Sequence, residues 1–477
     1  MNLLHWILIF LDVLIVMASA GHALLTKRDP RAALGWIAVC ILFPLVGPFL
    51  YYLFGINRIR TRAKKLARRS PFRIHVGYDK PEEEALPFPS SKNVPSEFIE
   101  IAKISDAVTR RSLVGGNLIE ILHNGEQAYP AMLDAIKNAA RSLFLATYIL
   151  ETNGAGSRFI EALAAAARRG VDVRVLLDGV GELYSSPRAG RLLKERGVRV
   201  ARFLPPKLFP PMFNINLRNH RKILVADGSM GFVGGMNIGD RHLGEVSLNP
   251  GRVIDLHFRL SGPVVAQVEQ VFLEDWSFAT GEQSSPTAIG TVRTGSAICR
   301  TIVDGPNEDM DKLAAILLGA IASAHRRISI MTPYFLPSRE MISALQTAAL
   351  RGIEVTVILP QKNNLPFVQW ATGNVLWDLL QRGVRIYYQP PPFVHTKLFI
   401  VDDHYTQIGS ANMDSRSLRL NFELAVEVYD KEFSEALATH IEETRKRSRE
   451  ITLEDVYTRP LPVRIRDALA WLCSPYL

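Results

Sequence analysis

The sequence predicts an α/β protein made of two related lobes that follow a pair of membrane helices. Three observations lead to this fold class: two long apolar runs at the start of the chain, a regular alternation of helical and strand-like patterns after them, and a polar motif that occurs twice. Helices alternating with short apolar strands indicate a mixed, mostly parallel sheet covered by helices on both faces. We therefore expect two transmembrane helices in residues 1–57, a basic juxtamembrane segment and linker in 58–95, a first lobe in 96–285, and a second lobe with a C-terminal amphipathic segment in 286–477.

The composition is that of a chain that buries a large core. The 477 residues are 48% apolar and 22% charged. The three cysteines are far apart and odd in number, which argues against a disulfide framework and a zinc site, and nothing in the sequence calls for a metal or another cofactor. The net charge is +9, but seven basic residues lie between Arg58 and Arg69, so removing them leaves +2 for the rest. The excess charge therefore marks one segment and not a nucleic-acid-binding body.

The two apolar runs extend from Leu3 to Thr26 and from Ala32 to about Phe54. Each is long enough to cross a hydrocarbon layer about 30 Å thick as a helix, with kinks expected at Pro44 and Pro48. Ala18-Ser19-Ala20 resembles a signal-peptidase site, but no basic residue precedes it and a second run follows at once, so a retained helical hairpin is favoured. The positive-inside rule places everything after the second run in the cytoplasm. There the basic residues meet anionic head groups or act only as a stop-transfer flank.

The remaining chain repeats a unit of helix, Arg-Gly turn and apolar strand. Each such stretch in the first half of the chain has a counterpart at a similar place in the second half. The matching stretches are 143–148 with 328–334, 169–177 with 351–359, and 196–200 with 382–386. The duplication predicts two lobes of the same architecture.

The polar motif has the form H-x-K-x4-D and falls late in each half. An asparagine follows its histidine by 17 residues in both copies. The two sets are His220, Lys222, Asp227 and Asn237, and His395, Lys397, Asp402 and Asn412. Because strand side chains alternate between two faces, a histidine and a lysine two residues apart point the same way. One histidine on an apolar strand is usually a core residue, but two matching copies favour a shared site at a pseudo-twofold axis.

This set of side chains suits transfer of a phosphodiester. One histidine can attack phosphorus and form a phosphohistidine, while the other protonates the leaving alcohol and deprotonates the incoming one. The lysines offset the charge of the diester, the asparagines donate to the same oxygens, and no metal is needed. Each histidine needs an orienting carboxylate. The candidates are Asp255 in the first lobe, with Glu245 as its competitor, and Glu423 in the second lobe.

The aspartates of the motif have two possible roles. Asp227 and Asp402 share the frame of the catalytic histidines and lysines, which places them among the candidate catalytic residues. Each also directly follows a strand, where a carboxylate can anchor a turn or a backbone amide. A structural role therefore competes with a catalytic one for both.

Two loops and the C-terminus are candidates for contact with lipid. Residues 203–213 and 387–393 are rich in proline and aromatic residues and precede the histidines. Such loops either dip into lipid at the mouth of a site or pack over a sheet edge. Residues 460–477 are expected to form an amphipathic helix that docks on the body or on the bilayer.

The doubled motif with its G-G/S-x-N turn resembles the phospholipase D superfamily. Other stretches resemble bacterial cardiolipin synthases, so that the resemblance covers essentially the full length: 28–36, 43–55, 235–240, 412–423 and 472–477. It implies two phospholipase D-like lobes and the transfer of a phosphatidyl group from one phosphatidylglycerol to another, giving cardiolipin and glycerol. By the same analogy His220 is the nucleophile and His395 the acid and base. Gly235 stands where the second copy has Ser410, which is a minor departure.

Three other functions stay open. A phospholipase D-type hydrolase would use the same residues with water as acceptor, and another phosphatidyltransferase would accept serine or use phosphatidylethanolamine as donor. A membrane-tethered nuclease or nucleic-acid-binding protein is disfavoured by the small charge of the body. The expected partners are phosphatidylglycerol and other anionic phospholipids and the bacterial cytoplasmic (inner) membrane, with the catalytic lobes on the cytoplasmic side and no nucleic acid. The sequence does not indicate an oligomeric state.

Overall fold

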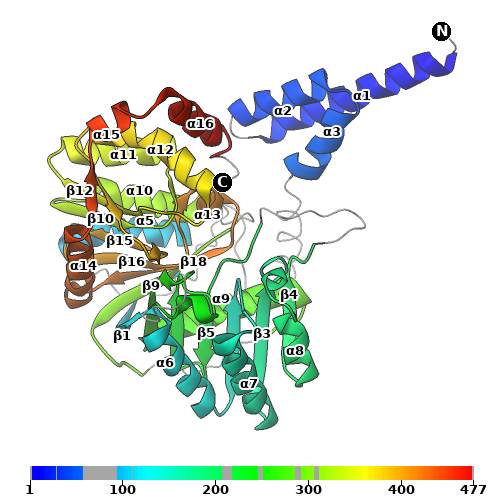
Figure 1. Cartoon of the computed structure of the whole chain (residues 1–477). Coiled ribbons are helices and arrows are strands. Elements are labelled where there is room, and N and C mark those ends of the chain that lie inside the picture. The colour runs from blue at the N-terminus through cyan, green and yellow to red at the C-terminus, as the bar shows by residue number, and fades with distance from the viewer. Residues whose placement is uncertain are drawn as a thin grey trace, which may run out of the picture.

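A computed structural model of the chain describes residues 3–27, 30–56, 94–109, 111–206, 217–244, 251–284, 292–305 and 311–474. The described residues form an N-terminal helical segment and a two-lobed α/β body (Figure 1). The basic run, nearly all of the linker, residues 207–213 of the first proline-rich stretch, and Glu245 lie outside these ranges. The expectations placed on them stay predictions.

The first apolar run forms one helix, whereas the second is divided. Among the described helices, α1 (Leu3–Thr26) is the one with the length and composition to cross a membrane. The second run breaks at Pro44, one of the two expected kinks, where Leu45 has a φ of 63°. A Cβ atom at Gly47 would collide with the carbonyl of Val39, so the two parts fold back closely on each other. The second run, expected as one span kinked at Pro44 and Pro48, consists of three short elements: α2 (Pro30–Leu42), α3 (Val46–Leu50) and the π-helical turn η1 (Tyr51–Gly55).

The first lobe alternates strands and helices as expected and ends in a helix that returns across the sheet. Its main elements are β1 (Val114–His123), α6 (Asn124–Asn138), β2 (Ser142–Thr147), α7 (Gly154–Arg168), β3 (Asp172–Asp178), α8 (Ala189–Glu195), β4 (Arg199–Phe203), β5 (Ile223–Ala226), β6 (Met230–Gly234), β8 (Leu256–Ser261) and α9 (Val264–Thr280). Three short elements lie near its site: η4 (Gly181–Tyr184), η5 (Asp240–His242) and β7 (Val253–Ile254).

The second lobe repeats this order and adds a C-terminal extension. Its main elements are β9 (Ala297–Asp304), α10 (Lys312–Ala322), β10 (Arg327–Met331), α11 (Arg339–Leu350), β12 (Glu354–Pro360), α12 (Pro366–Leu380), β13 (Arg385–Gln389), β15 (Leu398–Val401), β16 (Tyr405–Gly409), β18 (Glu423–Tyr429) and α14 (Lys431–Lys446). The short elements are β11 (Phe335–Leu336), β14 (Phe393–Val394), β17 (Met413–Asp414) and α13 (Ser415–Arg419). The extension comprises β19 (Arg449–Ile451), α15 (Leu453–Tyr457) and α16 (Leu461–Leu472).

One segment expected in the first lobe packs in the second. The turn η3 (Ser96–Phe98) and helix α5 (Ile99–Thr109) lie in the same hydrophobic core as α10 and β15. The side chain of Arg300 on β9 donates to the carbonyl of Ala102, and Ser105 donates to Glu427 at 2.8 Å. The expected lobe boundary therefore needs one exception, because residues 96–109 belong to the second lobe by packing.

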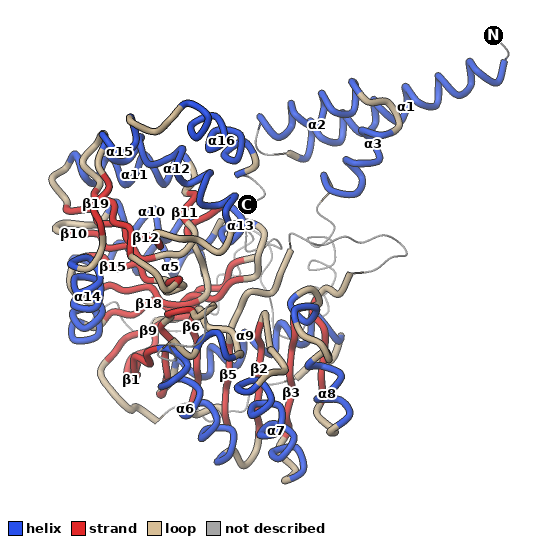
Figure 2. Tube along the Cα trace, in the orientation of Figure 1, coloured by secondary structure: helices blue, strands red, loops and turns tan. Residues whose placement is uncertain are grey.

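A single sheet runs through both lobes (Figure 2). Among the described residues it has fifteen strands, in the order β19-β13-β12-β10-β15-β16-β18-β9-β1-β8-β6-β5-β2-β3-β4. The pairs β2–β3, β3–β4, β10–β12 and β12–β13 are parallel, and the other pairs in the sheet are antiparallel. The expectation of a mixed sheet is confirmed, but "mostly parallel" is wrong, because short turns join β5 to β6 and β15 to β16 and only antiparallel neighbours can be joined that way.

The hydrophobic core is layered. An inner core between the lobes contains α9 and α14, which follow β8 and β18 at equivalent places. In this core Phe144 stacks on Phe272 with ring centroids 5.0 Å apart. Separate outer cores lie under α6, α7 and α8 in the first lobe and under α10, α11 and α12 in the second. The inner core fixes the two lobes against each other and so fixes the two polar motifs.

Candidate active site

Each motif histidine precedes a central strand and is held by the backbone of the other lobe. The amide of His220 donates to the carbonyl of Phe422 at 2.9 Å, and the amide of His395 donates to the carbonyl of Ile254 at 2.8 Å. Both contacts belong to short parallel pairings: Asn219 with Phe422, and β14 with β7. Phe422 and Ile254 directly precede the two candidate carboxylates. The backbone therefore carries each carboxylate to the histidine of the opposite lobe.

The side chains are paired between the lobes in the same way as the backbone. His220 Nδ1 lies 3.1 Å from Glu423 Oε1 and 3.2 Å from Oε2, while His395 Nδ1 lies 2.9 Å from Asp255 Oδ2. The sequence led us to expect Asp255 with the first-lobe histidine and Glu423 with the second. That pairing is wrong, because the repeats meet at a pseudo-twofold axis and each carboxylate strand lies beside the partner lobe's histidine.

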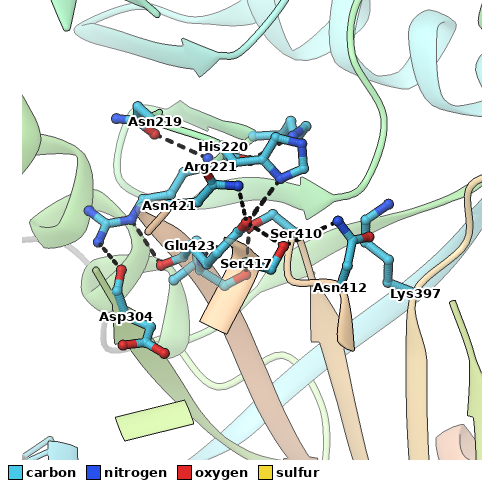
Figure 3. Close-up of polar contacts among 12 residues, drawn as sticks. Asn219, His220, Arg221, Asp304, Lys397, Ser410, Asn412, Ser417, Asn421 and Glu423 are labelled. Carbon is cyan, nitrogen blue, oxygen red and sulfur yellow. Dashed lines mark hydrogen bonds and ion pairs between the residues drawn. The ribbon is translucent and has the colours of Figure 1, made fainter. Parts of the chain in front are cut away.

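Glu423 sits in a network of hydrogen bonds (Figure 3). Its carboxylate accepts from Ser410 Oγ, from Ser417 Oγ at 3.0 Å and from Asn421 Nδ2 at 3.2 Å. Burial works to raise the pKa of Glu423, but His220 and Lys222 outweigh it and hold this pKa below its usual value. The carboxylate therefore remains ionised beside His220.

The two lysines lie beside their own histidines, on the face that strand alternation predicts. Lys222 Nζ donates to the carbonyl of His220 at 2.6 Å. Lys397 Nζ donates to the carbonyl of His395 at 2.6 Å and lies 3.0 Å from Nδ1 and 3.2 Å from Nε2 of its ring. All four side chains are mostly or fully buried. Two cations and two imidazoles in so small a space favour an anion between them.

Burial and mutual repulsion shift these groups toward their neutral forms. Burial lowers the pKa of His220, and burial with the charges of Lys397 and Lys222 lowers that of His395 well below its usual range. Burial lowers the pKa of Lys397 to about 8 and that of Lys222 well below its usual value. Burial raises the pKa of Asp255. Shifts of several groups toward neutrality in one place are typical of functional sites.

The two asparagines occupy equivalent places but have different partners. Asn237 Oδ1 accepts from the amide of Ile149 at 3.2 Å, and Asn412 Nδ2 donates to Ser417 Oγ at 3.2 Å. Asn412 is buried, and within the described part of the chain its Oδ1 has no hydrogen-bond partner. Asn412 therefore joins the Glu423 network, and Asn237 fixes the end of the strand that leads to Tyr148.

The motif aspartates do not face the histidines. Asp227 accepts from the amides that open β2, those of residues 140, 141 and 142, at 2.7–2.9 Å. Asp402 accepts from the equivalent amides of residues 325, 326 and 327 at 2.8–3.0 Å. Both have left-handed φ angles, 52° and 55°, and lie at the far end of the motif strand from the histidine. Their place among the catalytic candidates is therefore corrected to a structural one.

Sequence reasoning missed several residues of the site. The ring of Tyr148 lies 5.6 Å from that of His220, and the ring of Tyr334 lies 6.1 Å from that of His395. The pair of tyrosines was visible as part of the repeat, but nothing in their spacing indicated contact with the histidines. Gly235 also matters more than expected: a Cβ atom there would lie 2.8 Å from Asp255 Oδ2, so the glycine leaves room for this carboxylate. Among the described residues, no group of three or more His, Cys, Asp or Glu side chains is placed to hold a metal ion.

Both lobes match a family of known proteins. Residues 132–276 and 317–445 match the family described as cardiolipin synthase, PLD-like domain. The chain belongs to this family. Residues 6–55 match the family described as phospholipase D-nuclease N-terminal, which together with α1 indicates association with a membrane.

Relatives match along nearly the whole chain. Cardiolipin synthase A of Pseudomonas putida (strain KT2440) is 32% identical over 97% of this chain and 96% of its own length. Major cardiolipin synthase ClsA of Bacillus subtilis (strain 168) is 32% identical over 94% of this chain and 95% of its own. Among solved structures, phosphatidylserine synthase of Haemophilus influenzae has a TM-score of 0.61 and 15% identity, covering 79% of this chain and all of its own, which shows the fold. The chain is thus an enzyme of the phosphatidyltransferase type, with phospholipid substrates.

Proposed function

We propose that the protein is a cardiolipin synthase that transfers a phosphatidyl group from one phosphatidylglycerol to another. The observation that carries this proposal is the pair of motif histidines, each held by the carboxylate of the opposite lobe and each with its own lysine beside it. Nearly full-length similarity to cardiolipin synthases supports phosphatidylglycerol as the substrate.

His220 is the nucleophile. Its Nδ1 faces an ionised Glu423, which leaves Nε2 for the phosphorus atom and stabilises the positive ring of a phosphohistidine. Nε2 attacks the phosphorus of the first phosphatidylglycerol, the phosphorus–oxygen bond to the terminal glycerol breaks, and the glycerol oxygen takes a proton from His395. Lys222 and Lys397 offset the charge on the phosphoryl oxygens during this step. The phosphodiester anion also favours the protonated form of His395 against its lowered pKa.

The second step reverses the proton transfer. His395, now neutral, takes the proton from a glycerol hydroxyl of a second phosphatidylglycerol, and the oxygen attacks the phosphorus. The bond between phosphorus and His220 breaks, and cardiolipin leaves. Asp255 holds the ring of His395 through Nδ1 in both steps, so that Nε2 exchanges the proton.

The N-terminal helices hold this site at the inner membrane. In this proposal α1 spans the bilayer, the second run returns through it with a break at Pro44, and the catalytic lobes lie in the cytoplasm with anionic lipid as the partner. Trypsin added to sealed right-side-out and inside-out vesicles tests the orientation. Cleavage of the lobes only in inside-out vesicles is expected, and cleavage in right-side-out vesicles would contradict the topology.

The reaction is tested with the purified full chain in phosphatidylglycerol liposomes containing a metal chelator. Cardiolipin and glycerol are expected in equal amounts, and both are expected to be lost in His220→Ala and His395→Ala. Phosphatidic acid without cardiolipin would instead identify a hydrolase. Turnover only after addition of phosphatidylethanolamine would identify a different donor lipid, and no turnover of either lipid would refute the proposal.

A further inference from the structure

Exposed large apolar side chains gather on one side of the second lobe. Among the described residues 94–474, eight of the thirteen such side chains lie on or beside α12, α15 and α16. They are Leu365, Phe367, Trp377, Tyr457, Leu461, Ile465, Leu469 and Leu472. We define the apolar face as the six of these on α16 and at the start of α12: Leu461, Ile465, Leu469, Leu472, Leu365 and Phe367. A concentration of this kind on a surface marks contact with a partner or a membrane.

Helix α16 has an exposed apolar side and, opposite to it, a side packed on the body. Its exposed residues on the apolar face follow one another at spacings of four, four and three, which places them in one stripe along the helix. On the other side Ala470 and Asp467 are buried against α12, where a Cβ atom at Gly373 would lie 2.9 Å from Asp467 Oδ2. The outward stripe is therefore not needed to attach α16 to the body.

The charges of α16 suit an anionic surface. Asp467 is its single acidic residue, and that carboxylate is buried and paired with Arg459 at 2.8 Å and with Arg466 at 2.7 Å. Arg464 and Arg466 are exposed and flank the apolar stripe on either side. An apolar stripe bordered by arginines is typical of helices that lie in the plane of a membrane interface, with the guanidinium groups reaching the head groups.

The start of the apolar face is linked to the histidine site through Tyr334. Tyr334, which contacts the ring of His395, donates from its hydroxyl to Asn364 Oδ1 at 2.8 Å, and Asn364 directly precedes the apolar face at the start of α12. On the first-lobe side the exposed residues Leu183 and Tyr184 lie next to Tyr148, whose ring is 6.2 Å from that of Tyr184 and which contacts His220. Exposed apolar residues therefore adjoin the two tyrosines that contact the histidines, one in each lobe.

We propose that the apolar face lies in the interface of the lipid bilayer and holds the histidine site at the membrane surface. The proposal rests on the proposed function for the lipid nature of the substrate. A bilayer fits better than a protein partner because the stripe is narrow, bordered by arginines and joined to a site whose substrates reside in lipid. The N-terminal helix α1 keeps the chain near the membrane, so a single docking helix is enough to fix the orientation of the lobes.

Lipid-borne quenchers test the position of α16 in the full chain. Cys40 and Cys299 are buried and Cys473 is exposed, so the background variant is Cys473→Ser. A nitrobenzoxadiazole label is placed at Leu469→Cys, or at Leu350→Cys as the control. Leu350 is 67% exposed and Leu469 is 59% exposed. Leu350 ends α11 just before β12 begins, so it lies at the end of the strands opposite to the histidines. The protein is reconstituted in vesicles of phosphatidylglycerol and phosphatidylethanolamine with doxyl-labelled acyl chains.

The expected result is that label 469 is quenched by doxyl lipid and protected from iodide, and that label 350 shows the reverse. If label 469 is quenched by iodide as strongly as label 350, the face is in water and the proposal is overturned. If label 469 is protected from both quenchers, protein covers the face, whether a second copy or another segment of the chain, and the bilayer is excluded as its occupant. None of these readings depends on turnover, so they are separable from failure of the proposed function.

Activity on two forms of the substrate gives a second test. The variant Ile465→Ser/Leu469→Ser is expected to lose several-fold turnover of phosphatidylglycerol in vesicles but to match the unaltered chain on dihexanoyl phosphatidylglycerol dissolved as monomers. Leu350→Ser is the matched control and should match the unaltered chain on both. Equal loss on both substrates, or no loss on either, would overturn the proposal. An unaltered chain that makes no cardiolipin from either form would instead refute the proposed function.

Discussion

Two histidine–carboxylate hydrogen bonds that cross between the lobes organise the site at the level of single residues. Glu423 reaches His220 across 203 positions of sequence, and Asp255 reaches His395 across 140. An imidazole without a carboxylate partner would be free to rotate, whereas a carboxylate at Nδ1 fixes the ring and presents Nε2. Each lobe thus supplies the reacting group of its own half and the orienting group of the other.

Replacing Glu423 with glutamine should slow both chemical steps. Glu423→Gln keeps the size of the side chain but removes the negative charge that faces Nδ1 of His220, so a loss of turnover on the order of 10²-fold or more is expected. Because His220 is the proposed nucleophile, the release of glycerol in the first turnover should slow as much as the formation of cardiolipin. Rapid-quench measurement of both products, with enzyme in excess over lipid, checks this prediction.

The control for this prediction is Asp172→Asn, which removes a half-exposed carboxylate at the start of β3. Its activity should stay within about twofold of the unaltered chain, since exposed ion pairs contribute little. A Glu423→Gln variant that releases its first glycerol at the normal rate, with Asp255→Asn slow in that step, would reverse the assignment of His220 and His395.

The motif aspartates should matter for stability and not for chemistry. Asp402→Asn leaves one oxygen to accept from three backbone amides and removes the charge, so a loss of roughly 2 kcal/mol in the free energy of unfolding is expected. Turnover per folded molecule, measured about 10 °C below the melting temperature of the variant, should remain near normal. Abolished turnover in a fully folded Asp402→Asn protein would restore the catalytic reading.

The histidines, lysines, asparagines and carboxylates of the candidate site could be predicted from the sequence, but the pairing of each histidine with its carboxylate could not. The duplicated frame identified the histidines, lysines and asparagines, because the same residue types recur at the same spacing. It could not show that Asp255 pairs with the second histidine, because a repeat records what each lobe contains and not how the lobes face each other. The roles of Ser410 and Ser417 were equally hidden, since serines near a turn are common and only the fold brings them to Glu423.

Among the elements, α12 meets α16 at a glycine. Gly373 lies in the middle of α12, where Asp467 and Arg459 approach so closely that a Cβ atom would be 2.9 Å from each. Gly373→Leu improves the helix propensity of α12 by roughly 1 kcal/mol but has no space for its side chain. We expect α16 to separate from the body, with faster tryptic cleavage at Arg464 and Arg466 and a lower melting temperature.

A matched control lies on the same helix. Asp378 is on the exposed side of α12, so Asp378→Leu adds a similar side chain where there is room. Its cleavage by trypsin should match that of the unaltered chain. If Gly373→Leu is cleaved no faster than Asp378→Leu, then the close approach of α16 does not hold it in place.

The fold of each lobe could be predicted at this scale, with two exceptions. The alternating helices and strands predicted the parallel strand pairs, because each connecting helix and its Arg-Gly turn lie next to their strands in the sequence. Most strand pairs of the sheet are antiparallel for two reasons. The motif strands β5 and β15 form hairpins with β6 and β16, and the strands β1 and β9 join the two lobes. The repeat in the sequence did not show how β1 and β9 pair. The packing of α5 in the second lobe could not be foreseen either, because it depends on contacts such as Ser105 with Glu427, 322 residues apart.

On the scale of the whole molecule, one sheet and one inner core make the two lobes a single folding unit. The sheet passes from β9 to β1 without interruption, and α9 and α14 share one hydrophobic cluster. The interior of this unit contains ionisable groups that are neutral in the folded protein. The stability of the body therefore depends on pH through groups that lie in both lobes.

The pH dependence can be derived from three histidines, of which His242 and His257 are buried and His440 is partly buried. Burial lowers the pKa of His242 to about 3 and those of His257 and His440 to about 4, whereas an unfolded histidine titrates near 6.5. Because the unfolded chain binds these protons first, stability is fully present above pH 6.5 and is lost as the pH falls toward 4, by roughly 2 kcal/mol per histidine at pH 5. The raised pKa of Asp255 acts in the opposite sense and offsets part of this loss.

The melting temperature of the detergent-solubilised full chain should therefore fall markedly between pH 7.5 and pH 5. His440 lies on α14 beside His123, with ring centroids 5.6 Å apart, and has no role in the proposed reaction, so His440→Gln removes one of the three histidines. This variant should lose less of its melting temperature over the same interval and keep its turnover at pH 7.5. An unaltered chain whose melting temperature is constant from pH 7.5 to 5, or a His440→Gln variant with an unchanged slope, would show that these histidines do not fold in the neutral form.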